Sequence, residues 1–381
     1  MVALKKWIWF LCCVGILGQV GVASAEELVR QMSLRYAKGF KVEYFDTYKV
    51  VTVMMPWPGA EESYQYVLVP KGAEIPDGFA DDQKIEIPLK RLITTSTTHL
   101  PHLALLEEVE SLVGIDGIQY VNSPSVNALF QTGKLAEVGH GASIDLEKSL
   151  ALETDLVMTT AMAAGQNNAH PVLHQAGVPV VINGAYAEPS LLGRTEWLKF
   201  VAAFYNKEDL AKARFDSIVA RYQAYADRTK DLHQNRRPTV FGGALWRGTW
   251  YVSGGKTYVA QLIKDAGGTY LWADDDSRQS LSLDFEVVYE KAHHADCWLT
   301  KRNEWHALAD VVSADDRYGD FAAFQSGQVY NANARLSENG GNDYWESGLV
   351  EPDVVLADLI KIFHPELLPN HQLKFYKRLG Q

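Results

Sequence analysis

The sequence predicts an α/β protein of two lobes joined by a single long helix, with an extra β-hairpin near the N-terminus. Short β-branched runs alternate with helical patterns between residues 91 and 182, which predicts a parallel sheet covered on both faces. A continuous helical pattern follows from Lys207 to His233. The alternation of strands and helices restarts after Pro238, so a second sheet is expected.

The N-terminal hairpin is predicted by two strand patterns. The segment from Lys41 to Pro56 alternates apolar and polar residues, and the segment from Glu61 to Pro70 forms a second strand pattern. Pro58 and Gly59 separate the two segments. We therefore expect an antiparallel addition at the edge of a larger sheet.

The elements of the two lobes follow from hydrophobic periodicity and from glycine and proline breaks. In the first lobe we expect strands at Arg91–Ser96, Leu156–Met158 and Val178–Ile182, and helices at Leu100–Leu112 (ended by Gly114), Asp145–Leu152 and Pro171–Gln175. In the second lobe we expect strands at Thr239–Phe241, Asp296–Leu299 and Gly327–Tyr330, and helices at Thr257–Lys264 and Pro352–Phe363.

The connection between the lobes is predicted to be helical. Leu191 to Tyr205 forms one helix, and Asn206 precedes a longer one whose first turn carries Glu208 and Asp209, as the helix dipole favours. A helix from Lys207 to His233 would be ~40 Å long, which suits a strut between domains. An ordinary long surface helix is the alternative. The expected domains are residues 26–192, 193–233 and 234–381, after a signal peptide at residues 1–25.

The N-terminal segment has the pattern of a secretory signal. Lys5 and Lys6 precede an apolar run, and Ala23-Ser24-Ala25 supplies the small residues of a cleavage site. The run is only marginally long enough for a membrane anchor. Cys12 and Cys13 lack a small residue before them, so they do not form the usual lipoprotein signal and would leave with the segment. We therefore expect a periplasmic protein.

Charge and cysteine content exclude several classes of function. The formal charge is −11 and becomes −13 without Lys5 and Lys6, which argues against nucleic acid as a partner. Beyond the signal segment only Cys297 remains, so the mature chain has no intrachain disulfide and no set of thiolates for an iron–sulfur cluster. A two-lobed metalloenzyme or a hydrolase is therefore disfavoured. Common catalytic motifs are absent from the sequence, and no enzyme activity is expected.

Five segments, taken in order, resemble a known family. They are Leu92–Ser96, Asp145–Val157, Gln175–Val181, Gly254–Gly268 and Gln328–Tyr330. Their order and spacing are similar to those of periplasmic substrate-binding proteins of ABC importers for iron–siderophore complexes, heme and cobalamin. The resemblance implies two Rossmann-like lobes, one rigid linking helix and a ligand cleft between the lobes. It also implies a membrane permease as partner; we expect a monomer without a resident cofactor.

Candidate ligand-binding residues come from the loops beyond the strand ends, where doubly wound sheets bind ligands. The second-lobe loops are rich in aromatic rings and arginine, which suit a large chelate, porphyrin or corrin with anionic groups. These candidates are Trp246, Arg247, Trp250, Tyr251, Arg302, Trp305, Tyr344 and Trp345, with His99 from the first lobe. About half of the rings are expected to face the ligand and the others to pack the core.

Two further features concern metals and docking. His99 and His102 follow a predicted strand end, and His140 and His170 are expected in neighbouring loops. A zinc- or manganese-binding protein is the alternative function if several such ligands converge. The resemblance further implies a glutamate on each lobe that docks onto the permease. Glu286 matches that position in the second lobe, whereas residues 166–168 of the first lobe contain no acid.

Overall fold

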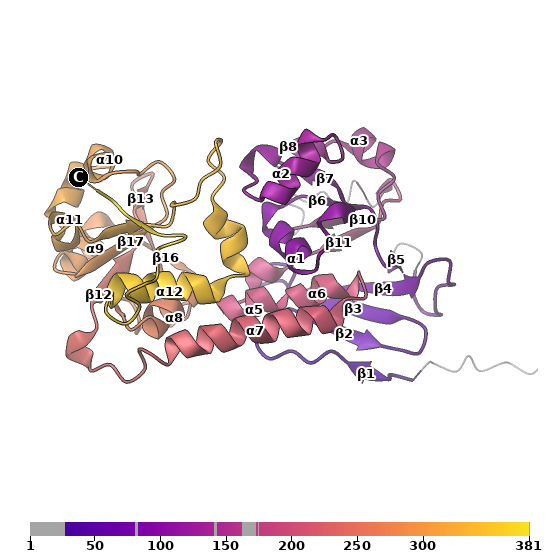
Figure 1. Cartoon of the computed structure of the whole chain (residues 1–381), viewed down its shortest axis with the longest axis horizontal. Helices are drawn as coiled ribbons and strands as arrows, with labels where there is room; N and C mark the ends of the chain where they lie inside the picture. The colour runs from indigo at the N-terminus through magenta and orange to yellow at the C-terminus, as the bar shows by residue number, and fades with distance from the viewer. Residues whose placement is uncertain (1–26, 81–82, 141–142, 162–172, 174, 381) are drawn as a thin grey trace, which may run out of the picture.

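The structure of the protein is a computed structural model that describes residues 27–80, 83–140, 143–161, 173 and 175–380 (Figure 1). It contains two mainly parallel sheets, two mainly antiparallel sheets and helices that pack around them. The predicted α/β fold with two lobes is thereby confirmed. The expected signal segment and the helix at Pro171–Gln175 lie wholly or largely outside the described residues. Within the described ranges, no helix combines the length and apolarity needed to span a bilayer.

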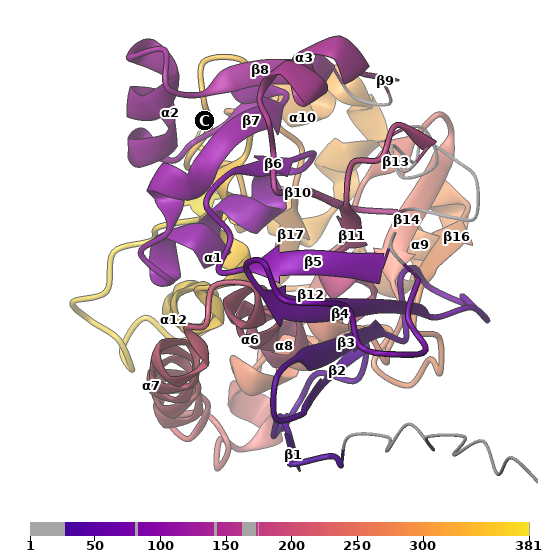
Figure 2. The same ribbon diagram turned by 90° about the vertical axis from the view of Figure 1, so that its right-hand side faces the viewer.

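The N-terminal addition is a five-stranded sheet rather than a hairpin (Figure 2). The segment predicted as one strand folds back on itself, because the Phe45 amide donates to the Tyr48 carbonyl in a turn. Phe40 packs its ring 4.8 Å from Trp197 and 5.5 Å from Phe200, so the sheet is built onto the linking helices. Its strands, in their order in the sheet, are β1 (Arg30–Gln31), β2 (Phe40–Tyr44), β3 (Lys49–Val53), β4 (Tyr64–Pro70) and β5 (Lys84–Ile87).

The first-lobe sheet has the order β11-β10-β6-β7-β8-β9, and all but the last pairing are parallel. Its strands are β6 (Leu92–Thr94), β7 (Leu112–Asp116), β8 (Ala136–His140), β9 (Ser143–Ile144), β10 (Leu156–Thr159) and β11 (Val180–Ile182). Its helices are α1 (Leu100–Leu105), α2 (Pro124–Gln131) and α3 (Leu146–Ala151).

The helix predicted over Leu100–Leu112 is too long. Helix α1 stops after Leu105, and Glu107 has a φ of 60°. Gly114, expected to end the helix, lies inside strand β7 instead. A Cβ atom there would lie 2.8 Å from the Ile93 side chain and 2.9 Å from that of Val138, so the glycine permits close packing. The prediction was wrong because apolar residues at helical spacing continue from helix α1 into strand β7.

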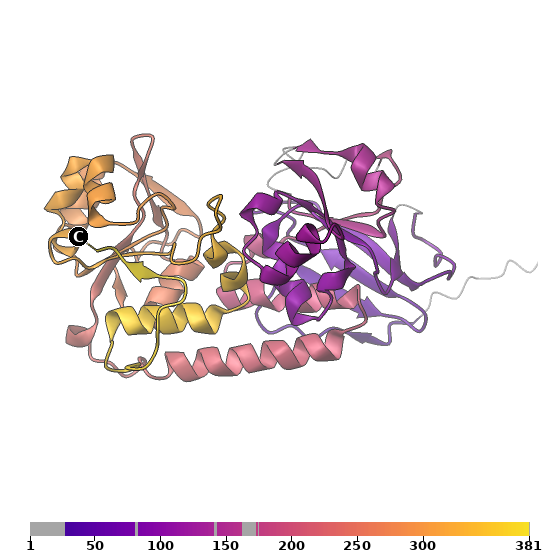
Figure 3. The same ribbon diagram turned by 45° about the horizontal axis from the view of Figure 1, so that its top comes forward.

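The link between the lobes consists of three helices, and the long one is shorter than predicted. They are α5 (Leu191–Glu196), α6 (Leu198–Ala203) and α7 (Glu208–Ala226). Helix α7 lies along the base beneath both lobes and beside α12 (Pro352–Phe363) (Figures 1 and 3). Its 19 residues give ~29 Å rather than ~40 Å. Past its end, the Arg237 side chain binds the carbonyls of Thr229 and Leu232, which holds residues 229–232 in a turn.

The second-lobe sheet has the order β15-β12-β17-β18-β19. Its strands are β12 (Thr239–Gly242), β15 (Thr269–Tyr270), β17 (Cys297–Thr300), β18 (Val329–Asn331) and β19 (Lys377–Arg378). A small antiparallel sheet adds β13 (Leu245–Trp246), β14 (Thr249–Ser253) and β16 (Ser280–Leu283). The helices include α8 (Tyr258–Asp265), α9 (Phe285–Ala292), α10 (Leu308–Ala314) and α11 (Ala322–Gln325).

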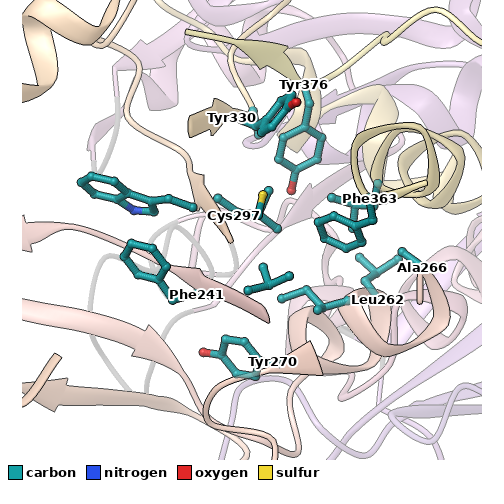
Figure 4. Close-up of a cluster of buried hydrophobic side chains, with 14 of the residues drawn as sticks. Phe241, Leu262, Ala266, Tyr270, Cys297, Tyr330, Phe363 and Tyr376 are labelled. Carbon is teal, nitrogen blue, oxygen red and sulfur yellow. The ribbon is translucent and has the colours of Figure 1, made fainter. Parts of the chain in front are cut away.

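The core of the second lobe is rich in aromatic rings. Phe241 stacks on Trp298 at 5.2 Å and on Phe321 at 5.1 Å, and all three are fully buried. Figure 4 shows the neighbouring part of this core, where residues of strands β12, β17 and β18 meet those of helices α8 and α12. A rigid aromatic core of this kind fixes the strand ends that follow it.

Two fully buried carboxylates tie the chain ends onto the helices. Glu196 accepts hydrogen bonds from the amides of Arg35, Tyr36 and Ala37 and pairs with Lys199 at 2.6 Å. Asp358 does the same in the second lobe, where its partners are the amides of Lys374, Phe375 and Tyr376 and the His371 ring. Each carboxylate accepts hydrogen bonds from backbone amides that would otherwise need water or another backbone group as acceptor.

Candidate functional site: the facing ends of the two parallel sheets

The carboxyl ends of the two parallel sheets face each other. The loop after β18 touches the loop after β7, with the Ser337 hydroxyl donating to the Gln119 carbonyl at 3.1 Å. The Asn122 side-chain amide donates to the Gly341 carbonyl at 3.1 Å. A Cβ atom on Gly341 would lie 1.9 Å from the Tyr120 carbonyl oxygen, so the backbones approach closely. These contacts bring together the strand ends at which open α/β sheets bind ligands.

Glu346 makes a further contact between the lobes. Its carboxylate accepts the backbone amides of Asn122 and Ser123, each at 2.8 Å, and its residue is 3% exposed. Burial raises the pKa of Glu346 to about 7, against the opposing effect of the two amide donors. The two lobes are therefore held by a titratable group as well as by neutral hydrogen bonds.

A cationic–aromatic cluster lies beside this contact. Lys301 directly follows strand β17, and its ammonium nitrogen lies 4.8 Å from the ring centroids of Tyr344 and Trp345. It lies 5.6 Å from the ring of Tyr258, at the start of helix α8. The ammonium is thus surrounded by aromatic faces, which stabilise a cation that has lost part of its hydration.

Arg194 of helix α5 brings a second cation to the same tyrosine. Its guanidinium carbon lies 4.3 Å from the Tyr258 ring centroid. It donates to the carbonyls of Tyr186, at 2.6 Å, and Glu188, at 3.2 Å. No carboxylate pairs with Arg194 or Lys301 among the residues that the structure describes. We call Arg194, Tyr258, Lys301, Tyr344 and Trp345 the Lys301 cluster.

Tyr344 and Tyr376 supply no negative charge. Burial raises the pKa of both hydroxyls far above the ordinary range, so both stay protonated. Lys301 and Arg194 therefore bring two positive charges to the cluster, and no carboxylate of the described residues is paired with either.

A second group of polar side chains surrounds Arg302. Its guanidinium pairs with Glu304 at 2.5 Å and lies 5.2 Å from the Trp246 ring centroid. Three buried atoms here have no hydrogen-bond partner: Arg302 Nε, Thr300 Oγ1 and Asn333 Oδ1. Their position at the ends of strands β17 and β18 leaves donors and acceptors available for a ligand or water.

The predicted aromatic set divides into exposed and buried rings. Trp246, Tyr251 and Trp345 are 53%, 44% and 38% exposed. Trp246 and Tyr251 lie on the β13–β14 hairpin, whose turn carries the exposed Arg247 with a φ of 51°. In contrast, Trp250 and Trp305 are buried in the aromatic core of the second lobe. Tyr344 is also buried, but it contacts Lys301.

His99 and His102 of the first lobe are buried and neutral. The Nδ1 atom of His99 lies 2.6 Å from the Thr94 hydroxyl and its Nε2 atom 3.2 Å from that of Thr160. Burial lowers the pKa of His99 to about 3 and that of His102 to about 4. Within the described ranges no three His, Cys, Asp or Glu side chains converge to hold a metal ion. His140 ends strand β8, and His170 lies outside the described residues.

Glu286 lies on the surface in the first turn of helix α9. Its side chain is 78% exposed and pairs with Arg317 at 3.5 Å. Residues 166–168, the first-lobe counterpart in the predicted docking, lie outside the described residues.

A large cavity of about 1050 Å³ lies elsewhere, between the C-terminal end of helix α7 and helix α8. Lys38, Ser190, Lys230 and Thr257 are among the residues that line it. None of the predicted ligand-binding residues does so, and among the described residues no buried polar side chain without a partner lines this cavity.

Comparison with known proteins decides the family. A family model described as periplasmic binding protein matches residues 92–336, which is more than half of the chain. The chain belongs to this family. Its members are solute-binding proteins that work outside the cytoplasm, and family membership agrees with the facing sheet ends described above.

Individual relatives agree with this assignment. Two uncharacterised lipoproteins of Methanocaldococcus jannaschii are 26% and 24% identical and align with 90% and 89% of this chain, and with 84% and 86% of their own lengths. A periplasmic heme-binding protein of Pseudomonas aeruginosa has a TM-score of 0.57 at 18% identity, covering 77% of this chain and 99% of that one. A protein of an Fe3+-hydroxamate transport system from Saccharomonospora viridis has a TM-score of 0.54 at 16% identity, covering 73% and 94%. The structural likenesses show a shared fold.

Three residues of the Lys301 cluster were missing from the sequence prediction. Lys301 lies beside the predicted Arg302 but was not among the candidate residues, and Tyr258 lies inside the predicted helix Thr257–Lys264. Arg194 lies in the predicted linking region, where no ligand was expected. The sequence feature that could have identified Lys301 is its position directly after a buried strand.

Proposed function

We propose that the protein captures an iron chelate, heme or cobalamin outside the cytoplasm and delivers it to the permease of an ABC importer. The observation that carries this proposal is the set of exposed rings and cations at the facing ends of the two sheets. Trp246 and Trp345 offer flat apolar surfaces, and Lys301 offers charge. A large ring-shaped or chelate ligand would use both.

The alternative, a binding protein for bare zinc or manganese, receives less support. Such a site needs three or four converging ligands. The ring nitrogens of His99 already contact threonine hydroxyls, and the described residues offer no metal-binding group. A bare ion also has no use for exposed tryptophans.

The proposal is tested by the absorbance spectrum of the protein purified from its native compartment. Heme, a ferric chelate and a corrin each give distinct visible bands. We expect one of these chromophores in the purified protein or after incubation with hemin, ferrichrome or cyanocobalamin, with quenching of tryptophan fluorescence. A colourless protein that contains stoichiometric zinc and binds none of the three would overturn the proposal.

Docking to the permease is proposed to involve Glu286. Its exposure and its position on a helix of the second lobe support this role. Reversal of the charge by Glu286→Lys is expected to leave ligand binding unchanged and to reduce uptake in cells. Asp276→Lys, at a residue whose carboxyl is 95% exposed, serves as the control. Equal uptake by the two variants would contradict this assignment.

A further inference from the structure

We infer that the ligand presents an anionic group, a carboxylate or a catecholate, to the two cations of the Lys301 cluster. The inference rests on the proposed function and narrows it to anionic iron chelates and heme, against neutral hydroxamates and cobalamin. Its basis is the juxtaposition of Lys301 and Arg194 on one tyrosine ring without an acidic partner.

The first step of the argument concerns solvation. Lys301 and Arg194 are both half-buried, so each has lost part of its water shell while retaining one approachable side. Removing a cation from water is costly unless an anion or several acceptors replace the water. A ring face returns only about 0.5–2 kcal/mol, which is less than a charge-assisted hydrogen bond with a carboxylate provides. Arg194 already has two carbonyl acceptors. Burial lowers the pKa of Lys301, but the hydroxyls of Tyr258 and Tyr344 outweigh it and raise that pKa overall. Within the described part of the chain neither cation is paired with a carboxylate, so the cluster keeps a net positive charge.

The second step is that the neighbouring carboxylates are already engaged. Glu346, adjacent to Trp345, accepts the amides of the first lobe. Asp343 pairs with Arg335 at 2.6 Å, and Glu351 forms an ion pair with Lys374. Glu188 accepts two backbone amides and the Trp197 indole through Oε1, and its buried Oε2 has no hydrogen-bond partner among the described residues and forms no ion pair with Arg194.

The third step distinguishes this cluster from the other cations nearby. Arg302 is neutralised by Glu304, and Arg317 is paired with Asp315. Lys301 and Arg194 thus stand apart as cations that meet at one ring, at the junction of helix α5 and the end of strand β17. The exposed Trp345 beside them adds a surface on which a planar ligand can stack.

The test compares anionic with neutral ligands. Hemin and a ferric tris-catecholate are the anionic probes, and ferrichrome and cyanocobalamin are the neutral ones. Each is titrated into the intact wild-type protein and followed by tryptophan fluorescence. We expect the wild type to bind at least one anionic probe more tightly than either neutral probe, and to do so less tightly at high salt.

Three variants assign the effect to Lys301. Lys301→Met is expected to weaken binding of the anionic probe on the order of 10- to 100-fold, the value of a charge-assisted hydrogen bond. Lys301→Arg is expected to retain most of the affinity. Lys291→Met is the matched control, because Lys291 also lies over a tryptophan ring, 5.3 Å from that of Trp272, on the distant helix α9. Circular dichroism and thermal unfolding establish that each variant is folded.

The possible results distinguish failure of this inference from failure of the proposed function. Tightest binding of a neutral probe, or anionic binding that Lys301→Met leaves unchanged, would overturn the inference and leave the proposed function standing. Failure of all four probes to bind the folded wild type would overturn the proposed function, and the inference with it.

Discussion

Replacement of Glu196 by alanine should destabilise the protein strongly. The carboxylate is fully buried and accepts three backbone amides, at 2.7 to 3.0 Å, in addition to the Lys199 ammonium. Glu196→Ala leaves that ammonium with the Ser33 carbonyl as its remaining hydrogen-bond partner. Breaking a buried ion pair by removing one partner costs about 3–5 kcal/mol. The lost amide contacts place the expected loss near the upper end, at about 4 kcal/mol.

The assay is equilibrium unfolding in urea at pH 7. A loss of about 4 kcal/mol corresponds to a fall in Tm of about 5 °C if the chain unfolds as one unit. The double variant Glu196→Ala, Lys199→Met should recover about 2 kcal/mol, because it removes the unpaired charge but not the unpaired amides. Asp227→Asn, which breaks an exposed pair with Lys230, is the control and should change stability by less than about 1 kcal/mol. A Glu196→Ala variant as stable as this control would refute the reasoning.

Three further predictions concern the lobe contact and the buried thiol. Because burial raises the pKa of Glu346 to about 7 while the lobes touch, formation of the contact favours the protonated carboxyl. The stability of the contact should be highest below about pH 4.5 and fall as the pH rises to about 7. The measurement is the hydrogen-exchange protection factor of the Asn122 amide, taken relative to the intrinsic exchange rate at each pH, and a protection factor that does not change with pH would contradict this. Gly341→Ala should push the loop off the Tyr120 carbonyl and increase the radius of gyration in small-angle scattering; an unchanged radius would count against it. Cys297, whose thiol pKa is raised by burial, should react with a thiol reagent only after unfolding, and rapid reaction in the native protein would disprove this.

The sequence predicted best those elements whose local signals agree with their packing. Helix α12 has the predicted bounds, because Pro352 occupies its first turn and the chain turns away before Pro365. Helix α3 begins as expected, with the Asp145 side chain accepting the Lys148 amide. In these places the ends are fixed by residues close in the chain, which a sequence displays directly.

Errors arose where distant contacts decide the outcome. The chain that leaves helix α7 is held by distant residues: the Thr229 hydroxyl donates to the Asp265 carbonyl, and Arg237 binds the carbonyls of Thr229 and Leu232. The division of the predicted aromatic set depends on strand register, which directs Trp250 into the core and Tyr251 outward. A sequence pattern shows that tryptophans lie in a loop region, but only the register shows which side each ring takes.

The contact of Glu346 with the first lobe has a consequence for helix α2. The Ser123 hydroxyl, at the N-cap position, makes no hydrogen bond to the amides of the first turn. The backbone amides of Asn122 and Ser123, the two residues just before the helix, donate to the Glu346 carboxyl of the other lobe. The other lobe therefore fixes the segment that enters helix α2 and places an acidic group at its N-terminus, where the helix dipole favours negative charge by about 0.3–1 kcal/mol. Separation of the lobes removes this group, so the first lobe alone should contain a less stable α2 than the whole protein.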